Sequence, residues 1–273
     1  MSAPEIIKLK QQIEELISDN KKLNSKLEES EMMKTHFISN VMNEIYNPFA
    51  SIISMAENIK TLKEDNLHKA NDMAKIIVDE AQKLDFQLKN LFAAARLEAG
   101  VEDLEYVNTD LSHIVDPILH KLKNEIDIRD LSIDYTCDFG ENSFFHTDKN
   151  KLILIVENLV SNAVKFSKDN GKVGISIFKG ENTIEIKVTN TPPKGLKINV
   201  DEAFDRFKRG DSTINSVRGG NGLGLSIVKE YVDLLNGDLS IDQNGKLNIT
   251  IYIPEQIKDI NSEDDILTEE EFF

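Results

Sequence analysis

ENLVSNAVKFS (157–167) and GGNGLGLSIVKEYVDLLNG (219–237) are the two stretches that decide the fold of this 273-residue chain. The first predicts a helix with Asn158, Asn162 and Lys165 on one face and apolar residues on its other faces. The second predicts a glycine-rich loop followed by an amphipathic helix. Carboxamide oxygens can ligate Mg²⁺, and backbone N–H groups in such a loop can approach an anion where a helix begins. Together the two stretches predict a nucleotide pocket.

Two common nucleotide motifs are excluded. The glycines follow the polar stretch KRGDSTINSVR (208–218) and no apolar strand, so a dinucleotide-binding fingerprint does not fit, and no Walker lysine motif is present. Taken alone, the asparagine helix is more commonly a solvated helix face, and the glycine run a turn or a helix cap. Their order along the chain, with AFDRFKRGD (203–211) just before the glycines, favours the pocket.

The C-terminal half resembles the ATP-binding domain of bacterial sensor histidine kinases, a branch of the ATPase fold shared with gyrase-type enzymes. ENLVSNAVKFS resembles the asparagine box of that family, AFDRFKRGD its phenylalanine box, and GGNGLGLSIVK (219–229) its second glycine box. Upstream, RLEAG (96–100) resembles the end of the family's second dimerisation helix. The resemblance covers residues 30–255.

The resemblance implies roles for the nucleotide-site residues. Asn162 would ligate Mg²⁺ and Lys165 would contact phosphate, while Arg206 and Arg209 would lie near the γ-phosphate; ordinary surface charge is the equal alternative for Arg209. Asn158 stands where hydrolytic relatives carry a general-base glutamate, so rapid ATP hydrolysis is not expected. The remaining expected nucleotide contacts are Asn190, Gly220, Gly222, Leu223 and Gly224.

The first glycine box departs from the family pattern. VTNTPPKGLKI (188–198) has Asn190 where the family has an aspartate that accepts from the adenine amino group, and Pro192 and Lys194 where it has glycines. Asn190 can still accept through its oxygen but lacks the assistance of a charge. Proline fixes φ, so the loop must follow another path. We expect ATP binding to persist, with lower affinity or relaxed adenine selectivity.

A second departure concerns phosphoryl transfer. FISNVMNEIYNPFASII (37–53) resembles the family's phosphoacceptor motif, His-Glu-x-x-Thr/Asn-Pro, with Asn43 at the histidine position and Glu44, Asn47 and Pro48 retained. An imidazole nitrogen is nucleophilic near neutral pH, whereas the lone pair of an amide nitrogen is delocalised. We therefore expect no self-phosphorylation at Asn43. His36, seven residues earlier, lacks an adjacent acid and is predicted to be an ordinary helical histidine.

The first thirty residues carry a heptad pattern with apolar residues at alternating spacings of three and four, interrupted by Asn20. This pattern predicts a coiled coil in which a buried asparagine fixes the register and a two-stranded state. A single amphipathic helix on a globular core is the alternative. The seam residues are Ile6, Leu9, Ile13, Leu16, Asn20, Leu23 and Leu27.

The predicted fold class is α+β, with a helical N-terminal part and a gyrase-type α/β sandwich that binds ATP. Helices over 31–62 and 66–98, joined by TLKEDN, suit an antiparallel hairpin that forms a four-helix bundle in a homodimer. Alternating apolar and polar residues predict strands at 131–137, 173–178, 183–189 and 247–253, in a sheet with helices on one face. The predicted parts are a coiled-coil helix (1–30), the dimerising hairpin (31–100), a linker (101–109), the ATP-binding domain (110–257) and an acidic, disordered tail (258–273).

Composition limits the class of protein further. A single cysteine, Cys137, excludes an internal disulfide and fits a reducing compartment. No apolar run approaches the ~20 residues that a membrane span needs. A formal net charge of −16 argues against nucleic acid and anionic membranes as partners. The expected location is the cytoplasm.

Three functions fit these observations. The first is a two-component signalling pseudokinase that binds ATP and Mg²⁺ and holds or switches a partner, either the receiver domain of a response regulator or another histidine kinase. The second is a phosphatase of the regulator's aspartyl phosphate, with Glu44 and Asn47 as the retained residues. The third is a working kinase in which Asn43 is an engineered change; Tyr46, where Arg or Lys is usual, and the altered adenine loop favour natural divergence instead.

Overall fold

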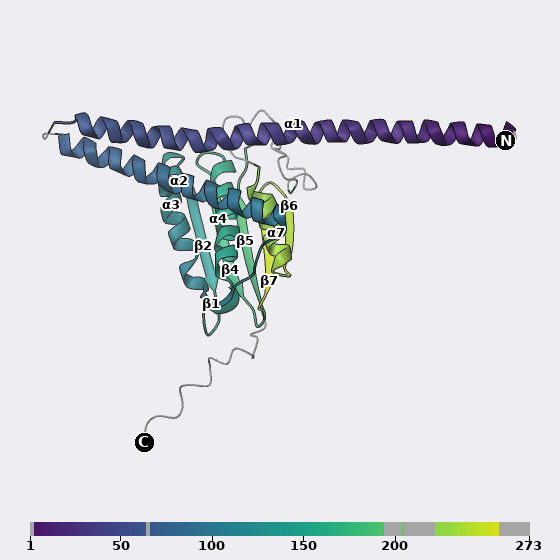
Figure 1. Ribbon diagram of the computed structural model, residues 1–273. Helices are drawn as coiled ribbons and strands as arrows, with labels where there is room; N and C mark the ends of the chain where they lie inside the picture. The colour runs from purple at the N-terminus through teal and green to yellow at the C-terminus, as the bar shows by residue number, and fades with distance from the viewer. Residues whose placement is uncertain (1–2, 64–65, 194–203, 205–221, 257–273) are drawn as a thin grey trace, which may run out of the picture. The chain divides into compact units, whose positions relative to one another are not determined.

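The computed structural model describes residues 3–63, 66–193, 204 and 222–256 (Figure 1). Its described residues fall into two compact units, one up to Gln87 together with Gly222, the other from Leu88 to Phe204 and from Leu223 onward. The boundary at Gln87 lies inside the second long helix, thirteen residues before the linker expected at 101–109. Each unit is described by itself.

The first unit is helical. Helix α1 (Ala3–Thr61) runs for 59 residues without interruption, and α2 (Leu67–Ala99) is the next helix along the chain (Figure 1). This confirms the two predicted helices; the turn expected between them includes residues 64 and 65, which lie outside the described residues. In the single chain the seam residues Leu16, Leu23 and Leu27 are 61–68% exposed. The coiled coil that would cover them stays a prediction.

The second unit is built around a five-stranded sheet with the order β2-β4-β5-β7-β6 (Figure 1). β2 and β4 are parallel, and the other neighbouring pairs are antiparallel. Four of the strands coincide with the four predicted from alternation. Their bounds are β2 (Ser132–Asp138), β4 (Lys172–Lys179), β5 (Thr183–Asn190), β6 (Asp238–Gln243) and β7 (Leu247–Pro254).

A second, two-stranded sheet joins β1 (Tyr106–Asp110) to β3 (Phe144–Asp148), with Tyr106 opposite Asp148. β1 therefore takes up residues 106–109 of the stretch expected to be a linker. Alternation did not reveal this strand because it has five residues and only one buried side chain, Thr109. The backbone N–H of Glu105 also donates to the Asp148 carboxylate, at 2.9 Å, which holds the approach to β1 in place.

Helices cover one face of the large sheet, as predicted. They are α3 (Val115–Ile128), α4 (Lys149–Phe166) and α7 (Gly224–Leu234), and a short 3₁₀ helix, η2 (Leu111–His113), precedes α3. Alternate strand residues point into the core and are nearly all inaccessible to solvent, which supplies the main apolar burial of the unit. These residues are Val173, Ile175, Ile177, Ile184, Ile186, Val188, Ile249, Ile251 and Ile253.

None of the helices in the described part of the chain combines the length and the apolar composition that crossing a membrane requires.

Candidate functional site

Helix α4 presents its asparagines to the first residue of α7. A Cβ built on Gly224 would lie 2.7 Å from Asn158 Oδ1 and 3.4 Å from Asn162 Nδ2. Real Cβ atoms essentially never approach an oxygen so closely, so any larger residue at 224 would force the Asn158 side chain or one of the helices to move. The structure thus brings the asparagine helix and the end of the glycine loop together, although some sixty residues separate them in the sequence.

Asn158 is held by two hydrogen bonds. Its side chain is 3% exposed, and its Nδ2 donates to the Leu154 carbonyl at 2.9 Å and to Asn90 Oδ1 at 2.7 Å. Asn90 belongs to the C-terminal end of α2 and is itself 7% exposed. The sequence reasoning missed Asn90. The sequence feature that could have revealed it is a polar residue between Leu88 and Leu91, on a helix that was expected to bury its leucines.

The residues around the start of α7 are ordered by local constraints. Gly222 has φ of +68°, a left-handed conformation that favours glycine. Leu223 is 1% exposed, and its carbonyl accepts from Ser226 Oγ and from the Ile227 N–H, both at 2.9 Å. The expected contacts Arg206, Arg209 and Gly220 lie outside the described residues.

Asn190 ends strand β5 with an unsatisfied donor. Its side chain is 3% exposed, and its buried Nδ2 has no hydrogen-bond partner among the described residues. Leaving a buried donor unpaired costs about 1–3 kcal/mol, which a ligand acceptor would recover. The next residue ties this end of β5 to the end of α4, since the Thr191 carbonyl accepts from the Lys168 N–H at 2.8 Å.

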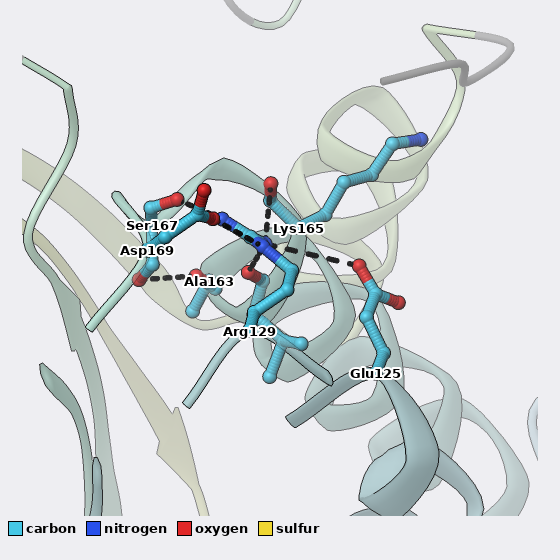
Figure 2. A network of polar contacts seen from close by, with 7 residues as sticks. Glu125, Arg129, Ala163, Lys165, Ser167 and Asp169 are labelled. Atoms are coloured by element: carbon cyan, nitrogen blue, oxygen red, sulfur yellow. Dashed lines mark hydrogen bonds and ion pairs between the residues drawn. The ribbon is translucent and has the colours of Figure 1, made fainter. Parts of the chain in front are cut away.

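The C-terminal end of α4, which carries Lys165, is closed by Arg129 from the end of α3 (Figure 2). The Arg129 guanidinium donates to the carbonyls of Val164, Lys165 and Ser167 and pairs with Asp169 at 2.9 Å. Carbonyls at a helix C-terminus lack intrahelical donors, so a planar fork of five N–H groups satisfies several at once. Arg129 was not found from the sequence, where nothing connects it to a segment 35 residues away.

Lys165 itself is half-buried, and its Nζ lies 5.6 Å from the centroid of the Phe166 ring. Figure 2 shows its side chain directed away from the Arg129 contacts. The site therefore has a cation at the end of the helix that carries Asn158 and Asn162.

A buried charge cluster fixes the opposite end of α4. Asp148 caps the helix by accepting from the Lys151 N–H at 3.0 Å, and Lys151 Nζ lies 2.9 Å from Asp148 and 3.1 Å from Glu102. Tyr231 of α7 donates to Glu102 at 3.2 Å. Burial opposes the charge on Asp148, but hydrogen bonds from Glu105, Lys151 and the Lys151 ammonium outweigh it and lower the pKa of the carboxyl.

The same balance acts on Lys151. Burial by itself lowers the pKa of its ammonium, yet hydrogen bonds to Asp148 and Glu102 outweigh burial and raise it. Both shifts favour the charged forms, so Asp148 and Lys151 form an ion pair at neutral pH. The cluster joins the segment before β1, the start of α4 and the middle of α7.

Asn43, Glu44 and Asn47 lie in the first unit, on α1. Asn43 and Asn47 are exposed and one helical turn apart on the same face, while Glu44 is half-buried. Pro48 lies inside the helix. Asn43, at the histidine position of the motif, and Asn47, one of the two residues retained for the phosphatase alternative, are therefore both accessible in the single chain.

The residues present fit a nucleotide with Mg²⁺. Two carboxamides lie against a glycine at which a side chain would displace Asn158, and within the described part of the chain the buried Nδ2 of Asn190 has no acceptor. Carboxamide oxygens are suitable ligands for a hard divalent cation.

Comparison with known proteins agrees with this geometry. Residues 147–257 match the family of histidine kinase-, DNA gyrase B- and HSP90-like ATPases. Over 254 residues, 89% of this chain, the sequence is 32% identical to hybrid signal transduction histidine kinase D of Dictyostelium discoideum. Over 266 residues it is 25% identical to the histidine protein kinase SaeS of Staphylococcus aureus. Residues 147–257 therefore form an ATPase domain of that family, and along most of its length the chain is similar to histidine kinases.

The chain spans 16% of the length of the Dictyostelium protein and 74% of SaeS. Solved histidine kinases share its fold. AdeS of Acinetobacter baumannii superposes with a TM-score of 0.53 at 19% identity, over 79% of this chain and 98% of that one. ThkA, solved in complex with the response regulator protein TrrA, superposes with a TM-score of 0.50 at 19% identity, over 84% of this chain and 64% of that one. The chain thus carries a histidine kinase-type ATPase domain of two-component signalling.

Proposed function

We propose that this chain is a two-component pseudokinase, which binds ATP and Mg²⁺ but does not phosphorylate itself at the usual position. The observation that supports this proposal is the contrast between two features. Asn158 and Asn162 lie against Gly224 as a nucleotide site would need, whereas Asn43 stands at the histidine position of the phosphoacceptor-like motif. The amide nitrogen of Asn43 cannot form the N–P bond that an imidazole forms. Nucleotide binding then acts as a conformational signal.

In this proposal each nucleotide-site residue has one task. Asn162 ligates Mg²⁺, and Lys165, Arg206 and Arg209 neutralise phosphate charge. The backbone from Gly220 to Gly224, with Leu223, adjoins the phosphates at the N-terminus of α7. Mg²⁺, when bound, supplies charge neutralisation between the phosphates. With Asn158 in place of a general base, hydrolysis is slow.

Two kinds of partner fit this role. A second copy of the chain would complete the coiled coil and the helical bundle, and the receiver domain of a response regulator, or another histidine kinase, would be the protein that the dimer holds or switches. The regulator is supported by the ThkA relative, which was solved with such a partner. The single cysteine, Cys137, is consistent with residence in the cytoplasm.

The direct test is incorporation of phosphate from γ-labelled ATP into the native chain and into Asn43→His. We expect no label on the native chain and acid-labile label on the variant, because the substitution restores the nucleophile. Label on the native chain would reject the pseudokinase and point to His36 or to a working kinase. The absence of label on both proteins would indicate a second defect, in the nucleotide site.

Nucleobase recognition tests the site without any transfer reaction. A carboxamide at 190 offers a donor and an acceptor, so it can pair with adenine or with the 6-keto edge of guanine or hypoxanthine, whereas a carboxylate only accepts. We expect the native chain to bind ATP, GTP and ITP with similar dissociation constants. Asn190→Asp should tighten ATP and weaken GTP and ITP about tenfold or more. Equal selectivity in both proteins would remove Asn190 from the base site.

A second candidate function follows from the exposed face of α1. Asn47 is accessible there, and its side chain can orient a water that attacks the phosphorus of a regulator's aspartyl phosphate. In that step the water oxygen bonds to phosphorus, the P–O bond to aspartate breaks, and inorganic phosphate leaves. No nucleophilic histidine is needed. The native chain would shorten the lifetime of a phosphorylated regulator, and Asn47→Ala would restore it; unchanged lifetimes exclude this activity.

A further inference from the structure

The orientation of the Asn158 side chain is decided by its neighbours. The Leu154 carbonyl can only accept a hydrogen bond, so the atom that faces it at 2.9 Å must be Nδ2. The same Nδ2 lies 2.7 Å from Asn90, which must then present its oxygen. Both hydrogens of Nδ2 are thereby engaged, and Oδ1 is the atom of Asn158 that faces Gly224.

Asn90 is an unusual residue for its place in the fold. It is 7% exposed and lies beside the buried Ala93 and Ala94 in the C-terminal part of α2. A buried carboxamide is stable when its polar atoms are paired, and Asn158 is the partner that the structure provides. Without Asn90, a single hydrogen bond to Leu154 would hold the Asn158 amide, which is then freer to turn.

We propose that Asn90 is a positioning residue for the nucleotide site, which acts by fixing Asn158 with its oxygen toward Gly224. The inference rests on the proposed binding of ATP at this site. α2 is continuous from Leu67 to Ala99, so the helix that forms the hairpin also carries the residue that sets Asn158. Nucleotide affinity therefore depends on whether the C-terminal end of α2 holds Asn90 against Asn158. By linkage, nucleotide binding favours the position of α2 in which this hydrogen bond is made.

The experiment measures the dissociation constant for MgATP by calorimetry in the full chain and in two variants of nearly equal volume. Asn90→Leu removes the acceptor, and Asn90→Asp keeps it. We expect Asn90→Leu to weaken binding about three- to tenfold, the usual effect of one hydrogen bond. Asn90→Asp should stay within about twofold of the native chain, because Asn158 keeps its partner.

A double-mutant cycle separates positioning from general destabilisation. Asn90→Leu should weaken binding in the native background and have little effect in an Asn158→Ala background, because its action passes through Asn158. Melting temperatures of the same proteins report folding independently. If Asn158→Ala abolishes MgATP binding, the cycle cannot be completed. The difference between the dissociation constants of Asn90→Leu and Asn90→Asp then tests the positioning role alone.

The outcomes of the two proposals are distinct. No MgATP binding by the native chain would reject the proposed function, and this inference with it. Native binding with equal affinity in Asn90→Leu would reject the inference alone, as would equal losses for Asn90→Leu and Asn90→Asp. A similar loss from Asn90→Leu with and without Asn158 would also overturn it, since Asn90 would then act by another route.

Discussion

Gly224 is a position at which one methyl group changes the site. Its missing side chain leaves space for Asn158 Oδ1, which would lie 2.7 Å from a Cβ, and for Asn162. Gly224→Ala should weaken MgATP binding at least about tenfold and reduce the free energy of unfolding by about 1–3 kcal/mol, as overpacking does. Calorimetry and urea unfolding measure the two effects.

Gly174→Ala on β4 is the matched control. A Cβ there meets the Thr189 Cβ at 3.6 Å, an ordinary van der Waals contact, so both quantities should change little. If Gly224→Ala binds MgATP as tightly as Gly174→Ala does, the close contact between α4 and α7 is not part of the nucleotide site.

Asp110 makes the stability of the second unit depend on acid pH. Hydrogen bonds from Ser143 Oγ at 2.6 Å and Ser112 Oγ at 2.7 Å lower the pKa of its carboxyl from 3.8 to about 2. Because the folded state holds this proton more weakly, the contribution of Asp110 is complete above pH 3.8 and is lost as the pH falls toward 2. Asp110→Asn should therefore have a lower free energy of unfolding than the native chain at pH 6. Near pH 2 the two proteins should have nearly the same free energy of unfolding.

Urea unfolding of both proteins at pH 6, 4 and 3 checks this prediction. Asp238→Asn, at an exposed position, is the control for the loss of one negative charge. A difference between native and Asp110→Asn that stays constant from pH 6 to pH 3 would contradict the assigned role of the two serines.

At the scale of elements, α4 depends on groups supplied by its neighbours at both ends. Asp148 caps its start, and Arg129 from α3 satisfies carbonyls at its end (Figure 2). Arg129→Lys keeps the charge but loses the planar fork, so several carbonyls lose a donor. We expect a loss of about 1–3 kcal/mol in the free energy of unfolding, measured with urea.

The ion pair of Arg129 contributes less to this effect than its carbonyl contacts. Asp169 has a side chain that is 66% exposed, so the pair is screened by water. Asp169→Asn should cost well under half of what Arg129→Lys costs. The reverse order would mean that charge, and not capping of the helix end, is what Arg129 provides.

At the scale of the whole molecule, we predict that the apolar seam of α1 packs against a second helix. Leu16 and Leu23 are 68% and 66% exposed in one chain, and a partner helix would remove this apolar surface from water. We expect a dimer in light scattering, and a shift toward monomer for the double variant Leu16→Glu and Leu23→Glu, because like charges at core positions repel across the seam.

Ser18→Glu with Ser25→Glu is the matched control for this experiment. It adds the same charge to positions that the heptad places away from the seam, so the dimer should persist. A monomeric native chain, or equal dissociation in both double variants, would argue against the predicted coiled coil.

The sequence by itself determined the elements whose signal is local. Alternation in 173–178 and 183–189 predicted two central strands, and the spacing from Asn158 to Lys165 predicted the site helix, because pleat and helical turn repeat within a few residues. The asparagine at position 43, where the motif has a histidine, was likewise recognised from the neighbouring residues of that motif. β1 was missed since five residues with one buried side chain, Thr109, carry too little periodicity.

The tertiary structure decided which distant groups meet. Asn90 and Asn158 are 68 positions apart, and Arg129 reaches the end of α4 from 35 positions away. No local pattern encodes such pairs, because they arise only when helices pack and buried polar atoms must find partners. The same holds for Gly224. Its lack of a side chain matters only because the tertiary structure places Asn158 and Asn162 of α4 against it.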